Sequence, residues 1–110
     1  MAVVIWHNPR CSKSRQTLAL LDDPEVRLYL KDPPSAAEIA DALDLLGLTP
    51  AELIRSGEAQ FRVLGLSKTD PADTLLQAMA AHPILIERPI VFANGKAAIG
   101  RPPDAVLPIL

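Results

Sequence analysis

Short apolar segments, separated by prolines and turn residues, dominate the pattern of this 110-residue chain. Residues Ala2–Trp6 are apolar throughout and rich in β-branched side chains, which predicts a strand buried on both faces, as in parallel sheets. Val26–Leu30 is a second short strand candidate. Ile90–Ala93 and Lys96–Ile99 flank Asn94-Gly95, the strongest short signal for a β-hairpin.

Capping residues predict helices between these strands. Ser35 with Glu38 and Thr49 with Glu52 form capping boxes, in which each side chain satisfies a free amide of the first turn. Asp70-Pro71-Ala72-Asp73 predicts a helix start of the same kind. In chain order, the predicted helices begin at Cys11 or Ser12, Ser35, Thr49, Asp70 and Pro102.

The order of strand, helix, strand, several helices, hairpin and helix predicts an α/β fold. We expect a mixed sheet of about four strands with helices on both faces and a helical insertion, which is the thioredoxin-like plan. The length is typical of one domain, so residues 1–110 are predicted to form a single domain. No long amphipathic stripe is left over once one core is built, which favours a monomer.

Composition and charge argue against several classes of function. Apolar residues make up 49% and charged residues 22%, as in globular proteins, and the net charge of −2 argues against nucleic-acid or polybasic membrane binding while allowing a local basic pocket. No segment approaches the ~20 apolar residues of a membrane helix, and no signal peptide is visible. One cysteine cannot form an internal disulfide, and it has no metal-ligand spacing with the two histidines, so we predict a cytoplasmic protein without a metal.

Cys11 is the residue with the clearest chemical potential. It lies five residues after Trp6, where a predicted strand leads into a helix and where open α/β sheets bind ligands. The helix dipole and the free amides of the first turn favour a thiolate, and Arg10, Lys13 and Arg15 act in the same direction. A thiolate is a nucleophile, so Cys11 is a candidate catalytic residue. The alternative is a small buried side chain, the common fate of a free cysteine.

Other residues suggest a monothiol site that binds an oxyanion. Ser14 stands where a dithiol enzyme has its second cysteine, so any redox cycle must use an external thiol. Arg55, Arg88 and Arg101 carry guanidinium forks of the kind that bind tetrahedral oxyanions, although spacing alone favours three separate, solvated side chains. His7 could tune the thiolate by hydrogen bonding, or could pack locally in its loop.

Several segments together resemble the glutaredoxin-coupled arsenate reductase family. They occur in the family's order and span nearly the whole chain. They are Ile5–Arg15, Tyr29-Leu30, Pro33-Pro34, Leu53–Arg55, Leu64–Leu66, His82–Val91 and Gly100–Pro102. The basic loop with Arg10, Ser12 and Lys13 is closer to short chromosomal homologues than to plasmid-type enzymes.

The resemblance implies a specific chemistry. Cys11 would be the nucleophile that attacks arsenate, His7 would favour its thiolate, and the Arg88-Pro89 bond would be cis. Glutathione as reductant and glutaredoxin as partner would complete the reduction to arsenite. The implied substrate-binding residues are Arg55, Arg88, Arg101, Ser14 and Arg15.

Two other functions are compatible with these residues. One is a non-catalytic regulator of the Spx type that binds RNA polymerase, although Ser14 removes the second cysteine of its redox-switch versions. The other is a glutathione-dependent reductase of a different small substrate, which would keep the thiol chemistry of Cys11.

Overall fold

A computed structural model describes residues 2–110 of the chain, which fold into two compact units. The first unit combines the segment that ends at Asp32 with Arg88–Leu110, and the second is Pro33–Glu87. The second unit is the predicted helical insertion. The single domain expected over residues 1–110 stays a prediction.

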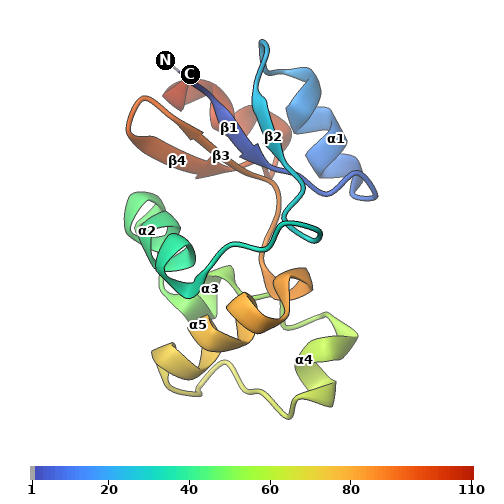
Figure 1. Cartoon of the computed structure of the whole chain (residues 1–110), viewed down its shortest axis with the longest axis vertical. Coiled ribbons are helices and arrows are strands. Elements are labelled where there is room, and N and C mark those ends of the chain that lie inside the picture. Colours follow the sequence, from blue (N-terminus) through green and yellow to red (C-terminus); the bar gives the residue numbers. More distant parts are fainter. Residues whose placement is uncertain (1) are drawn as a thin grey trace. The chain divides into compact units, whose positions relative to one another are not determined.

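The first unit contains the sheet (Figure 1). Its strands are β1 (Val4–Trp6), β2 (Glu25–Arg27), β3 (Ile90–Ala93) and β4 (Lys96–Ile99), in the spatial order β2-β1-β3-β4. Strands β1 and β2 are parallel, whereas β3 is antiparallel to both β1 and β4. The predicted α/β class with a mixed four-stranded sheet is therefore confirmed.

The strand boundaries differ from prediction in β2, where a local turn ends the strand. The β3–β4 hairpin has the predicted bounds, with Asn94 and Gly95 at φ 54° and 73°, the left-handed region that suits them. Strand β2, however, ends at Arg27. The carbonyl of Leu28 accepts the N–H of Lys31 at 2.9 Å, which turns the chain inside the predicted strand.

Helices pack against one face of this sheet. Helix α1 (Ser12–Ala19) contacts the C-terminal 3₁₀ helix η2 (Pro103–Ile109), and η2 also contacts β3 and β4. Ile5, Val91 and Val106 are fully buried at the centre of the resulting cluster. These contacts fix the start of α1 at the carboxyl end of β1.

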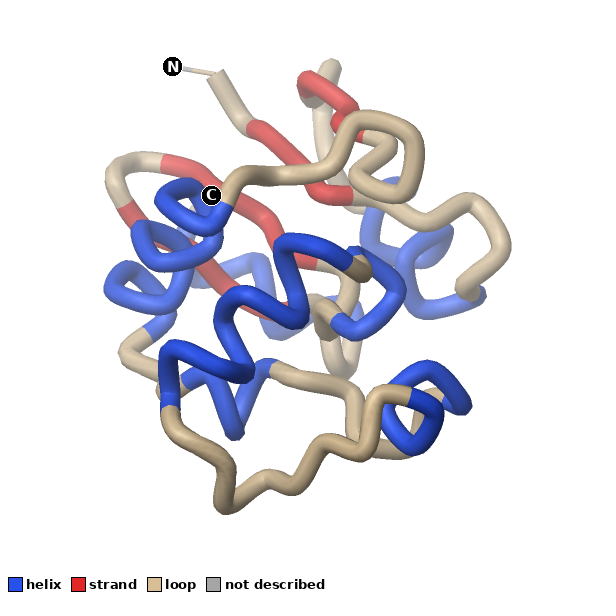
Figure 2. The backbone as a smooth tube through the Cα atoms, turned by 60° about the horizontal axis from the view of Figure 1, so that its bottom comes forward, coloured by secondary structure: helices blue, strands red, loops and turns tan. Residues whose placement is uncertain are grey.

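The second unit is helical, as the blue segments joined by tan loops show in Figure 2. Its longer helices α2 and α5 pack against each other, and α5 also packs against α3. Leu75 and Met79 of α5 are fully buried. The helices are α2 (Ala36–Leu46), α3 (Pro50–Leu53), α4 (Ala59–Val63), α5 (Ala72–Ala81) and the 3₁₀ helix η1 (Pro83–Leu85).

The predicted capping boxes begin α2 and α3. The N–H of Glu38 donates to Ser35 Oγ at 3.1 Å, and the N–H of Ser35 donates to Glu38 Oε1 at 3.0 Å. The prediction of a similar box at Asp70 is wrong, because Asp70 Oδ2 accepts the N–H of Ser67 at 2.9 Å and Pro71 occupies the capping position. Helix α4 was not predicted.

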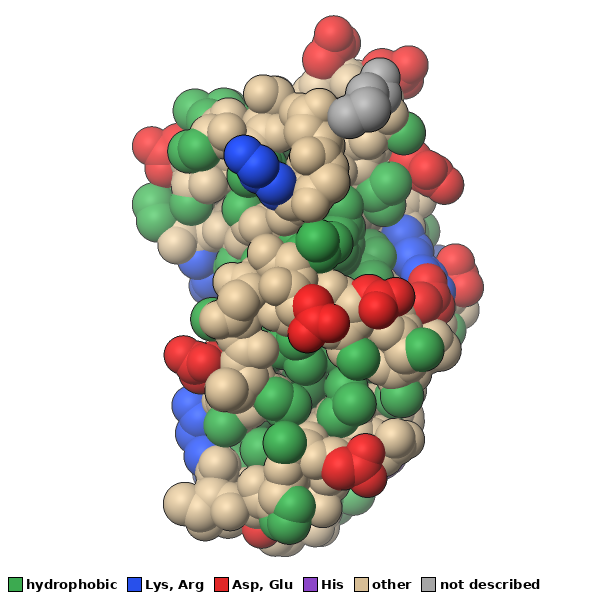
Figure 3. Space-filling view, turned by 90° about the vertical axis from the view of Figure 1, so that its left-hand side faces the viewer, with side chains coloured by type: hydrophobic (Ala, Val, Ile, Leu, Met, Phe, Trp, Pro, Cys, Tyr) green, Lys and Arg blue, Asp and Glu red, His purple; other side chains and the backbone are tan. Residues whose placement is uncertain are grey.

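Charge is distributed unevenly between the units. The first unit carries eight Lys and Arg against five Asp and Glu, a net charge of +3, whereas Pro33–Glu87 carries three against eight, a net charge of −5. The surface drawn in Figure 3 shows acidic side chains interspersed with hydrophobic ones. The small net charge of the chain is therefore the sum of a basic first unit and an acidic second unit.

Gly100 allows a close approach between three segments of the first unit. A Cβ atom at this position would overlap Thr17 Oγ1 and lie 2.8 Å from Pro89 Cγ. Thr17 is fully buried, and its hydroxyl donates to the carbonyl of Lys13 at 2.8 Å. Only glycine leaves room here for the Thr17 side chain. The Thr17 hydroxyl in turn holds the first turn of α1.

We expect Gly100→Ala to lower the free energy of unfolding by about 1–3 kcal/mol through overpacking. Urea denaturation would measure this change. Gly57→Ala is the matched control, because nothing lies within 4 Å of its added Cβ. Thr17→Ala should partly rescue Gly100→Ala, and a fully additive double variant would contradict the proposed overlap.

Candidate functional site

The turn after β1 places Cys11 at the start of α1. The N–H of Cys11 donates to the carbonyl of Asn8 at 3.0 Å, which closes a turn with Pro9 at the position that proline favours. The N–H of Arg10 donates to Asn8 Oδ1 at 3.0 Å and holds the same turn. The carbonyl of Cys11 accepts the first helical bond, from Arg15, at 3.0 Å. Cys11 is thus the N-cap residue of α1.

The surroundings of Cys11 stabilise its thiolate. Burial raises the pKa of the thiol, but this effect is outweighed by hydrogen bonding from the backbone N–H of Ser14, the Arg88 side chain and the backbone N–H of Lys13, and by the charge of Arg101. The pKa of Cys11 therefore lies below its ordinary value. These groups combine a helix N-terminus with two arginines, the arrangement that activates cysteine nucleophiles.

Arg88 and Arg101 come together at Cys11 from far along the chain. Arg101 Nη2 lies 3.5 Å from Cys11 Sγ, and Arg101 Nε donates to the carbonyl of Arg88 at 2.8 Å. The bonds Arg88–Pro89 and Arg101–Pro102 are both cis. The backbone of one arginine thus orients the guanidinium of the other, close to the sulfur.

His7 contacts Ser14 rather than the thiol in the hydrogen bonds that the structure records. His7 Nδ1 lies 2.6 Å from Ser14 Oγ, and this oxygen also accepts the N–H of Asn8 at 3.0 Å. Both side chains are buried. Burial, and secondarily the charge of Arg15, hold the pKa of His7 below its ordinary value, so the imidazole is neutral near pH 7. Any effect of His7 on the thiolate therefore passes through the loop.

The contacts of Ser14, Arg15 and Asn8 around this turn were not predicted from the sequence. The Ser14 hydroxyl forms hydrogen bonds with His7 and Asn8, while the backbone N–H of Ser14 donates a hydrogen bond to the thiolate. Arg15 Nη1 donates to the carbonyl of Pro9 at 2.8 Å and braces the turn. The Asn8-Pro9 pair is a turn signal in the sequence, but nothing in the sequence indicates that Asn8 is buried.

Arg55 belongs to the second unit, where two carboxylates hold its guanidinium. Arg55 Nη1 donates to Glu87 Oε1 at 2.6 Å, and Arg55 Nε donates to Glu58 Oε1 at 3.1 Å. Burial disfavours the charge, but the hydrogen bonds and charges of Glu87 and then Glu58 raise the pKa of Arg55 above its ordinary value. Arg55 is therefore a permanently charged and oriented guanidinium.

Within residues 2–110, no group of three or more His, Cys, Asp or Glu side chains is arranged to hold a metal ion. Over the same residues, every helix is too short or too polar to cross a bilayer.

Buried neutral His7 predicts a pH effect on stability. Its pKa in the folded chain lies below the unfolded value of 6.5, so the folded state binds fewer protons and stability falls as the pH drops below about 6.5. We expect His7→Gln to flatten the loss of unfolding free energy between pH 6.5 and 5, measured by urea denaturation at each pH. His82→Gln is the control, and an unchanged slope in His7→Gln would contradict this explanation.

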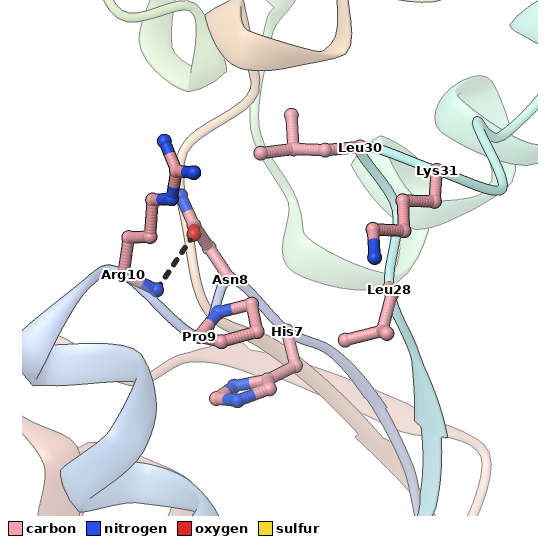
Figure 4. A pocket seen from close by; sticks show the side chains of 7 residues that line it. All are labelled: His7, Asn8, Pro9, Arg10, Leu28, Leu30 and Lys31. Carbon is pink, nitrogen blue, oxygen red and sulfur yellow. Dashed lines mark hydrogen bonds between the residues drawn. The ribbon is translucent and has the colours of Figure 1, made fainter.

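A pocket of about 430 Å³ opens beside the turn (Figure 4). One wall is the segment His7–Arg10 and the other comes from Leu28, Leu30 and Lys31, after β2. Because β1 and β2 are parallel, these two segments leave the sheet at the same edge. The pocket therefore lies at the carboxyl ends of adjacent strands, a usual place for ligands in α/β folds.

These features equip the first unit for nucleophilic attack on a small oxyanion. The thiolate supplies the nucleophile, and guanidiniums near it can bind negative oxygens through paired hydrogen bonds.

Comparisons with known proteins agree with this chemistry. The sequence profile of the ArsC family matches residues 6–109. The Escherichia coli K12 protein YfgD, named as uncharacterized, is 52% identical, with 98% of this chain and 96% of YfgD covered. An arsenate reductase of Neisseria meningitidis serogroup A is 46% identical over 98% of this chain and 97% of its own.

A solved structure gives the same result. The arsenate reductase from Vibrio cholerae has 48% sequence identity and a TM-score of 0.94, and the match covers 100% of this chain and 98% of that one. The resemblance predicted from the sequence is confirmed: this chain belongs to the ArsC family.

Proposed function

We propose that this protein reduces arsenate to arsenite with thiols as the reductant. The observation that carries the proposal is the Cys11 sulfur at the N-terminus of α1, with Arg101 Nη2 at 3.5 Å and a lowered thiol pKa. Relatives that match over nearly the full chain are named arsenate reductases, which supports arsenate as the oxyanion.

In the first step, the Cys11 thiolate attacks arsenic. A sulfur–arsenic bond forms, an arsenic–oxygen bond breaks, and the departing oxygen leaves as water after protonation. Arg88 and Arg101 would bind the remaining oxygens. Arsenic remains pentavalent, so this step transfers no net electrons.

Reduction then requires two external thiols. In sum, one arsenic acid and two thiols give one arsenous acid, one disulfide and one water, and the two electrons come from the two sulfur atoms. We propose glutathione as the small thiol and a glutaredoxin as the protein partner, because Cys11 is the only cysteine of the chain. When the disulfide leaves, arsenic is trivalent and still bound to Cys11, and water then hydrolyses the sulfur–arsenic bond, which releases arsenous acid and regenerates the Cys11 thiol.

The test is to incubate the purified chain with arsenate, glutathione and glutaredoxin and to measure arsenite. We expect turnover that falls to background when either thiol source is omitted. Alkylation of Cys11 by iodoacetamide should abolish activity, and arsenate should slow the alkylation. A chain that forms a mixed disulfide at Cys11 but no arsenite would instead be a reductase of another small substrate.

A further inference from the structure

We propose that the pocket between the His7–Arg10 turn and the Leu28–Lys31 segment binds a small thiol bearing carboxylates, the reductant of the reaction. This inference rests on the proposed function, because it assigns the reductant a place beside the proposed nucleophile. It gives a second role to the loop residues before Cys11 and brings in Leu28 and Lys31, to which neither the sequence motifs nor the oxyanion chemistry gave a role.

Size and position indicate a second ligand rather than arsenate. The volume of about 430 Å³ lies within the range of roughly 300–1,000 Å³ for small-molecule sites, and it far exceeds one tetrahedral anion. Cys11, Arg88 and Arg101 do not line it. The pocket is therefore separate from the guanidiniums at the sulfur.

The lining favours an anion with a short apolar body. Arg10 lies on one wall, and Lys31 lies on the opposite wall (Figure 4). Leu28 and Leu30 lie on the same wall as Lys31, and Leu30 is 39% exposed. The cationic side chains suit carboxylates, and the leucines suit aliphatic atoms.

Hydrogen bonds hold the floor of the pocket, and the unit that contains the pocket is basic. His7 and Asn8 are buried, and the turn that they begin is held by hydrogen bonds to Ser14 and Arg10. The unit that contains the pocket carries the net charge of +3, although the whole chain is acidic. An anionic thiol is therefore attracted to this unit.

The position also suits delivery of the thiol. Arg10 lines the pocket and is followed directly by Cys11, and consecutive Cα atoms are only about 3.8 Å apart. A tripeptide-sized molecule spans up to about 10 Å when extended. A ligand whose carboxylates lie between Arg10 and Lys31 can thus place its sulfur on the side of the turn where Cys11 lies.

The experiment that tests this inference uses S-methylglutathione, a thioether that can neither reduce arsenate nor form a disulfide. It is titrated into the isotope-labelled chain without arsenate, and backbone amides are followed by NMR. We expect saturable shifts at residues 7–10 and 28–31. Lys31→Gln should raise Kd roughly two- to fivefold, as expected for an exposed ion pair, and Lys31→Glu should raise it further. Lys96→Gln, in the β4 strand, is the charge-matched control and should leave Kd unchanged.

Two further measurements sharpen the test. The diester of S-methylglutathione should bind more weakly than the free acid, because it lacks the carboxylates. In the arsenate assay, Lys31→Gln should raise KM for glutathione while leaving KM for arsenate and kcat at saturating glutathione unchanged.

The inference is overturned if no saturable shifts occur at the pocket, if Lys31→Gln and Lys96→Gln behave alike, or if Lys31→Gln alters only the KM for glutaredoxin. Binding of S-methylglutathione by a chain that forms no arsenite would refute the proposed function and retain the pocket. Arsenite formation without this binding would refute the proposed pocket and retain the proposed function.

Discussion

Cys11→Ser is expected to lower arsenite formation by a factor on the order of 10³ or more, because it removes the nucleophile of the proposed first step. A serine hydroxyl is close in size to the thiol, but it remains protonated in the environment that ionises Cys11. This decrease is measured as the change in kcat/KM for arsenate at saturating glutathione and glutaredoxin.

The fold should survive this change. Cys11 is only partly buried, and the bonds that hold its turn come from backbone atoms and from Asn8. The melting temperature of Cys11→Ser should therefore stay close to that of the wild type, which separates loss of chemistry from loss of structure. A variant with unchanged melting and wild-type turnover would remove Cys11 from the mechanism.

The pH dependence gives an independent measure of the thiolate. Because hydrogen bonds and positive charge lower the pKa of Cys11 despite burial, alkylation by iodoacetamide should rise with pH around a midpoint below the ordinary thiol value of 9.0. The folded state releases this proton at lower pH than the unfolded state, so ionisation of Cys11 stabilises the fold as the pH rises. A midpoint at or above 9.0 would contradict the described surroundings of the sulfur.

Local features of the fold were predictable because local chemistry decides them. The Asn94-Gly95 turn requires left-handed backbone at both positions, and few other dipeptides accept it. The capping box of Ser35 and Glu38 satisfies its amides within one helical turn. Such features do not depend on the rest of the chain.

Other features were not predicted because the local sequence pattern is ambiguous. Leu28–Leu30 continue the apolar pattern of β2, yet a turn closed by Lys31 ends the strand. Helix α4 spans only Ala59–Val63, too short for a hydrophobic period to be visible. In both cases, the sequence pattern was compatible with more than one local structure.

The candidate site likewise has one feature that was predictable from the sequence and others that were not. The position of Cys11 at a helix start followed from the strand, the Asn-Pro turn and the helix signal. The approach of Arg101 to Cys11 spans 90 positions, and the two carboxylates on Arg55 come partly from 32 positions away. Resemblance to a family named these arginines, but their hydrogen-bond partners required the structure.

Arg101→Lys is expected to lower kcat/KM for arsenate by about 10²–10³, the loss typical of one preorganised contact to a developing oxyanion. Lysine keeps the positive charge but lacks the planar fork. It also cannot keep both contacts of Arg101, from Nε to the carbonyl of Arg88 and from Nη2 toward Cys11 Sγ. The control is Arg62→Lys, an exposed position in α4 where the same exchange should be neutral.

Comparing two readouts separates the roles of charge and geometry in Arg101→Lys. Burial and the hydrogen bonds from backbone N–H groups and Arg88 act on the pKa of Cys11 more strongly than the charge of Arg101, and lysine keeps that charge, so the iodoacetamide midpoint should move little. Oxyanion binding needs the fork, so kcat/KM for arsenate should fall steeply. Equal losses in alkylation rate and in turnover would mean that Arg101 serves the thiolate alone, and Arg88 would then have to hold the oxyanion without it.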